Sequence, residues 1–136
     1  MGQGSLNPCS LRRHDRAAAL LLAAGLQTCT AMKTVDYPVV AQERLAGDYQ
    51  ALSACVYDWL ERSYQAVFRY TTIAADNEAR LSREVGIGGG GVVTIWEARF
   101  RSAGNRSTLL TLRYNPRTLG QAADIRSIVD TARMCQ

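Results

Sequence analysis

Residues 92–101 read VVTIWEARFR, and their side chains alternate in character along the chain. One side of this stretch is mainly apolar and aromatic, whereas the other mixes aliphatic side chains with charged ones. The first side holds Thr94, Trp96, Ala98 and Phe100, and the second holds Val93, Ile95, Glu97, Arg99 and Arg101. A period of two is typical of a β-strand with one buried face. The stretch therefore predicts a strand from a sheet that covers a core on one side.

Similar patterns on both sides of this stretch predict further strands over 65–74, 79–87 and 107–114. The sequence SAGN at 102–105 is a hairpin signal between the last two strands. The run GIGGGG at Gly86–Gly91 lacks the Lys-Ser or Lys-Thr and the helix that a phosphate-binding loop needs. We expect a flexible hairpin loop there, with a permissive backbone that a ligand or a partner strand could approach.

Segments with helical periodicity precede and follow the predicted strands. Apolar residues recur at helical spacing over about 45–63 and again over about 119–135. Thr118 and Gln121 have the spacing of a capping box for the second helix. The expected order is α-β-β-β-β-α over a domain at 45–136. We predict an α+β, two-layer fold: an antiparallel sheet of three or four strands with both helices on one face.

The start of the chain has the layout of an export signal. Basic residues at 12–16 precede ten residues without a polar side chain, Ala17 to Leu26. That run is too short to span a bilayer, which takes about 20 residues, but it suits a secretory signal. A short buried helix is the alternative.

The residues Leu26-Gln27-Thr28-Cys29 follow this run, and the segment resembles the signal of a bacterial lipoprotein. The resemblance implies cleavage after residue 28, a diacylglycerol on the Cys29 thiol and stable anchoring by two or three acyl chains. Thr30, which is not aspartate, implies the outer membrane, facing the periplasm. Residues 1–28 would then be the signal peptide and residues 29–44, interrupted by Pro38, a tether. The alternative is secretion to the periplasm after cleavage before Met32.

The chain has four cysteines. Cys9 would leave with the signal, and Cys29 would be lipidated or removed. Two cysteines, Cys55 and Cys135, would remain, an even number in a compartment that permits disulfides. We predict that these two form a disulfide; two buried free thiols are the alternative.

Composition narrows the classes of function. Without the charged residues at 12–16, the net charge falls from +4 to +2, which argues against nucleic-acid binding. The single histidine, His14, also precedes the apolar run, so the mature chain would lack the commonest general base and metal ligand. We therefore expect neither a catalytic site nor a metal or other cofactor.

The second side of the 92–101 strand is the remaining candidate site. Val93, Ile95, Arg99 and Arg101, with Arg113 on the next strand, would form an open sheet face of aliphatic and arginine side chains. Arginine stems that merely shield the aliphatic residues are the alternative. The predicted function is a small envelope lipoprotein, a non-catalytic binding or assembly factor for another envelope protein. An envelope hydrolase, or a soluble periplasmic inhibitor of an envelope enzyme, is the alternative.

Overall fold

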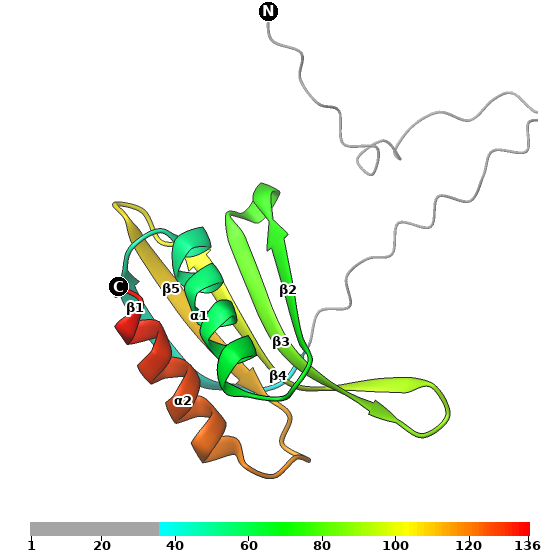
Figure 1. Cartoon of the computed structure of the whole chain (residues 1–136). Coiled ribbons are helices and arrows are strands. Elements are labelled where there is room, and N and C mark those ends of the chain that lie inside the picture. The colour runs from blue at the N-terminus through cyan, green and yellow to red at the C-terminus, as the bar shows by residue number, and fades with distance from the viewer. Residues whose placement is uncertain (1–35) are drawn as a thin grey trace, which may run out of the picture. The chain divides into compact units, whose positions relative to one another are not determined.

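Five strands and two main helices make up residues 36–136, the part of the chain that the computed structural model describes (Figure 1). A single-turn 3-10 helix, η1 (Ala74–Asp76), lies between two of the strands. The other elements, in chain order, are β1 (Val39–Ala46), α1 (Tyr49–Ser63), β2 (Phe68–Ile73), β3 (Glu78–Ile87), β4 (Gly91–Ser102), β5 (Ser107–Tyr114) and α2 (Gln121–Met134).

The strands form one sheet in the order β1-β5-β4-β3-β2, and every neighbouring pair is antiparallel. Helix α1 connects β1 at one edge with β2 at the other, and both helices cover the same face (Figure 1). The strand over 92–101 is thus the central one, β4. The α+β class is confirmed, but the sheet has five strands rather than the predicted three or four.

The additional strand is β1, which lies where the sequence predicts a tether up to residue 44. It pairs with β5 along one side only, and Leu45 is its only fully buried residue. An irregularity between Val39 and Ala41 also shifts its register. Val40 and Ala41 pack on the core but are only partly buried, so the strand has no clear two-residue period of apolar side chains.

Helix α1 begins at Tyr49 rather than near residue 45. Asp48 caps it, since its Oδ1 accepts hydrogen bonds from the backbone N–H groups of Gln50 (2.9 Å) and Ala51 (3.2 Å). Gly47, with φ of +119°, makes the turn from β1. Leu45 matches the helical period but belongs to the strand before this turn.

Helix α2 does not begin with the predicted capping box. Its N-cap is Gly120, at φ +89°, and no side chain caps its first turn. The Thr118 hydroxyl instead donates to the Asn115 carbonyl (2.9 Å), within the turn that follows β5. The capping-box prediction was wrong because Thr118 bonds backward to the turn before the helix starts.

The core lies between the sheet and the helices. Its largest side chains come from two of the three inner strands: Trp96 and Phe100 on β4, and Tyr114 on β5. Leu52, Val56 and Leu60 of α1 pack onto them, as the helical stripe predicts. Ile128 and Ala132 of α2 complete the layer.

A disulfide joins α1 to the end of α2. Cys55 and Cys135 are bonded, with their Cα atoms 6.1 Å apart, and this confirms the predicted pairing. The bridge spans 80 positions of sequence. Cys55 is exposed and Cys135 is half-buried, so the bond crosses the outer side of the helix layer.

Replacing both cysteines by serine should lower the free energy of unfolding by about 2 to 5 kcal/mol, because the unfolded chain loses a loop closure. Urea denaturation of the oxidised protein and the double variant measures this difference. Reduction of the parent protein should produce the same loss and leave the variant unchanged. Equal stability of all three forms would contradict the prediction.

Candidate functional site

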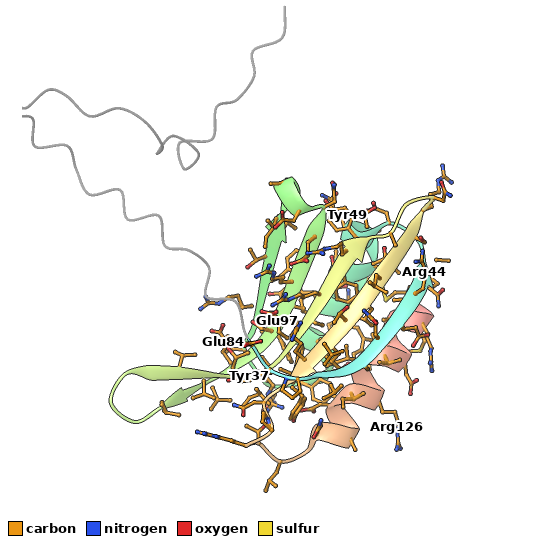
Figure 2. All side chains as sticks on the ribbon, turned by 180° about the vertical axis from the view of Figure 1, so that it is seen from behind. Tyr37, Arg44, Tyr49, Glu84, Glu97 and Arg126 are labelled. Carbon is orange, nitrogen blue, oxygen red and sulfur yellow. A yellow bond between two sulfur atoms is a disulfide. The ribbon has the colours of Figure 1, made fainter. Side chains whose placement is uncertain are left out.

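The sheet surface opposite the helices, here called the open face, is the main candidate site (Figure 2). Within residues 36–136, no helix or strand covers it. Alternation along the five strands places six arginines and three glutamates there. These are Arg44, Arg69, Arg80, Arg99, Arg101, Arg113, Glu78, Glu84 and Glu97.

Two of the glutamates are buried although no helix covers them. The Glu78 side chain is 1% exposed, and it accepts hydrogen bonds from Arg80 Nε (2.5 Å) and Arg101 Nε (3.1 Å). Glu97 is 7% exposed and binds Arg99 in the same way. The guanidinium groups therefore form an outer layer on the sheet, with carboxylates beneath them.

The carboxylates beneath the arginines explain how two arginines can occupy one cross-strand pair. Arg80 and Arg99 are directly opposite each other on β3 and β4, and like charges in such a pair are destabilising. Each arginine binds the glutamate two residues before it on its own strand. The carboxylates neutralise the pair and hold both guanidinium groups in place, so this part of the cationic surface is fixed in position.

The open face is electrostatically distinct from the rest of the domain. Its nine charged side chains sum to +3. The other described residues carry six arginines and eight carboxylates, which sum to −2. The net charge of residues 36–136, only +1, conceals this division between the open face and the rest of the domain. An acidic partner would therefore be attracted to the open face and weakly repelled by the helix side.

Three of the five predicted partner-binding residues lie on the open face: Arg99, Arg101 and Arg113. The other two, Val93 and Ile95, do not continue the row of β4 side chains on this face. β4 has one more residue than β3 between the pairs Arg83–Trp96 and Glu84–Thr94, and the extra residue is Ile95. Ile95 is half-buried against the core, and Val93 lies beyond the bulge, opposite Val85.

Sequence reasoning missed other members of the face. The sequence predicts a tether at Arg44, gives no face for Arg69, and predicts a strand that starts one residue after Glu78. The alternation of Arg80, Ser82 and Glu84 was a signal that could have led to Glu78, which extends the same row by two residues.

The chain enters the domain beside the open face. The Arg113 guanidinium donates to the Tyr37 carbonyl (2.6 Å), and the Asn115 side-chain amide donates to the Tyr37 hydroxyl (3.2 Å). Residues 37 and 113 therefore fix where the chain that follows Cys29 joins the sheet. Cys29 itself lies outside the described residues.

The glycine run forms the tip of a projecting hairpin (Figure 1). β3 continues to Ile87 and β4 starts at Gly91, so the turn is residues 88–90, shorter than the loop predicted at Gly86–Gly91. Beyond the bulge, residues 84–87 and 91–94 pair only with each other. This two-stranded extension has no neighbour at either edge within the described sheet.

A shallow recess, open to solvent, lies between the two helices and the sheet. Arg83 and Asp124 line it, with Arg83 Nη1 3.9 Å from Asp124 Oδ2. The Tyr114 hydroxyl donates to the same carboxylate oxygen (2.8 Å). Burial and this hydrogen bond raise the pKa of Tyr114. The three side chains connect β3 and β5 to the first turn of α2, so they position that helix.

No group of three or more potential metal-binding side chains occurs within residues 36–136. None of the helices in that range is long and apolar enough to cross a membrane.

No family model and no curated protein matches the chain.

Glu78→Gln should destabilise the domain by about 2 to 3 kcal/mol, because it leaves two guanidinium groups around a neutral amide. Glu84→Gln is the matched control: its partner Arg69 is 66% exposed, and such ion pairs contribute about 0 to 1 kcal/mol. Urea denaturation of both variants measures the difference. If the two substitutions cost the same, Glu78 does not anchor the arginine layer.

Proposed function

We propose that this chain is a small lipoprotein of the bacterial cell envelope whose domain binds an acidic envelope protein through the open face, without catalysis. The observation that carries the proposal is the separation of charge, with +3 on the open face and −2 on the remaining described surface. Arginine is well suited to this task because its planar guanidinium binds carboxylates in a bidentate way.

The rigidity of the face supports a binding role. The buried carboxylates orient Arg80, Arg99 and Arg101 before any partner arrives. Less side-chain freedom is then lost on association, and ordering each flexible side chain otherwise costs about 0.5 to 1.5 kcal/mol. Arg101 is 57% exposed despite its bond to Glu78, so a partner carboxylate can still reach it.

The lipoprotein part of the proposal has support in the sequence alone: a basic segment, a short apolar run and Leu26-x-x-Cys29. The outer membrane is the proposed location, with the domain in the periplasm. The Cys55–Cys135 disulfide is consistent with an oxidising compartment.

Cys29→Ser should abolish incorporation of a fatty-acid probe into the protein in a bacterial host, because the acceptor thiol is lost. Cys9→Ser is the matched control and should label like the parent, since Cys9 precedes the apolar run. Labelling is read by in-gel fluorescence, and fractionation of the membranes reports the location. Unchanged labelling of Cys29→Ser would refute lipidation at this residue.

Arg44→Glu combined with Arg69→Glu should reduce capture of the partner by at least about fivefold, because two cations facing an acidic surface become anions. These edge positions are chosen because neither contacts the buried Glu78 or Glu97. Arg99→Glu, in contrast, would place a second anion beside the buried Glu97 and could unfold the sheet.

The measurement is chemical crosslinking in membranes of the native host, followed by quantitative mass spectrometry. Arg126→Glu is a matched control: Arg126 is exposed on α2, on the helix side, and has no side-chain partner among the described residues (Figure 2). Capture by the double variant at the parent's level, or an equal loss with Arg126→Glu, would rule out the open face as the binding surface.

A further inference from the structure

The exposed apolar side chains of the domain gather at one end of the sheet. This end, here called the tether end, is where β1, β2 and β4 begin and β3 and β5 finish. Of the eight exposed large apolar residues among residues 36–136, seven belong to segments at this end. They are Val39, Tyr64, Val67, Val85, Ile87, Val92 and Leu119.

These seven residues come from separate parts of the chain. They lie at the start of β1, after α1, before β2, on the β3–β4 hairpin and in the turn before α2. Leu119 is 96% exposed. Single exposed apolar residues are ordinary, but a collection of them at one end is typical of a contact surface. The eighth residue, Met134, lies at the opposite end and is 70% exposed.

The hairpin is the most prominent part of this surface (Figure 1). Residues 85–96 include no charged side chain, although the flanking positions are Glu84 and Glu97. An isolated two-stranded ribbon is only marginally stable in water. An apolar ribbon without a neighbouring strand would gain stability from an external surface against which it can pack.

The point at which the preceding segment joins the domain indicates what this external surface is. The preceding segment joins the domain at the tether end, through Tyr37. Seven residue steps separate Cys29 from Asp36, and an extended chain covers at most about 25 Å in that distance. The strands are longer than this, since the 12 residues of β4 extend about 40 Å. With lipid on Cys29, the tether end is therefore the part of the domain held nearest to the bilayer.

A cation lies within the same surface. Arg117 is exposed two residues before Leu119, and its side chain has no ion pair or hydrogen bond among the described residues. Apolar side chains beside a free basic group suit the headgroup layer of an anionic membrane.

We propose that the tether end is a membrane-contact surface that binds the headgroup layer of a bilayer containing anionic phospholipid. The hairpin, the turn at Leu119 and the start of β1 enter this layer together. The depth is limited, because the free backbone groups along both hairpin edges need water and would be unsatisfied in hydrocarbon. The orientation rests on the proposed lipid at Cys29, whereas the affinity of the surface for lipid does not.

The test uses residues 30–136 without a lipid, a form that contains every described strand and helix and both bridged cysteines. The probe is vesicles of phosphatidylethanolamine and phosphatidylglycerol, and binding is measured by co-sedimentation. The parent chain should bind. Ile87→Asp with Val92→Asp should bind at least about tenfold more weakly, because two apolar side chains are lost from the contact. The matched control, Met134→Asp, should bind like the parent.

A second measurement locates the contact directly. The parent chain from residue 30 has no free thiol, so a cysteine introduced as Ile87→Cys or Met134→Cys can be labelled alone with an environment-sensitive dye. Vesicles should increase the emission at position 87 and leave position 134 unchanged. Melting curves establish that each variant is folded.

Failure of the parent to bind vesicles would overturn the proposal, as would equal binding by the hairpin variant or an equal loss with Met134→Asp. Loss of a crosslinked protein partner in the hairpin variant, with vesicle binding unchanged, would assign this end to a protein and also overturn it. Because the tested chain has no lipid, these outcomes are independent of fatty-acid labelling at Cys29 and of the open-face variants.

Discussion

The packing of both helices on one face of the sheet is the constraint on which the other features depend. α1 crosses from one sheet edge to the other and buries its stripe mainly against β3 and β4, and the disulfide holds α2 beside it. All the large core side chains then point to one side. The opposite face has no helix to cover it, so its side chains must be compatible with water and also protect the sheet backbone. Arginine side chains satisfy both requirements, because their methylene groups can cover the sheet. The charged ends of Arg69 and Arg101 remain exposed, whereas the largely buried Arg80 and Arg99 are paired with carboxylates.

Arginines on neighbouring strands repel one another, and this explains the unusual burial of Glu78 and Glu97. Burying a carboxylate is costly unless its charge is paired and its oxygens are hydrogen-bonded. Each of these carboxylates is beneath at least one guanidinium, and Glu78 binds two. The same contacts that stabilise the sheet thereby fix the arginines as a preformed cationic surface. Structural stability and the proposed binding role arise from one set of ion pairs.

Sequence reasoning predicted the features that depend on local periodicity and on elimination. The α+β class, the strand over 92–101 and the Cys55–Cys135 pairing follow from alternation, helical spacing and the cysteine count.

The features that the sequence did not predict depend on non-local contacts. β1 is recognisable only by its pairing with β5, and the bulge at Ile95 only by the register with β3. Thr118 and Gln121 have the right spacing for a cap, but the turn after β5 engages Thr118 first. Arg99, Arg101 and Arg113 are predicted on one face. The alternation along β3 could have placed Glu78 there as well, but its bond to Arg101 on the next strand does not show in one strand's pattern.

The two proposed surfaces are compatible because the strands run from one to the other. The tether end lies at one terminus of every strand, and the open face extends along their length. If the tether end lies on the bilayer, the strands rise away from it and the open face is presented sideways, toward proteins in the same membrane. A single lipid anchor would let the domain rotate about its tether. Contacts from the hairpin and from Leu119 would add two separated points of attachment, and such restraint raises the effective concentration of the open face for a neighbour in the membrane. The apolar end would thus orient the charged face rather than compete with it for the same partner.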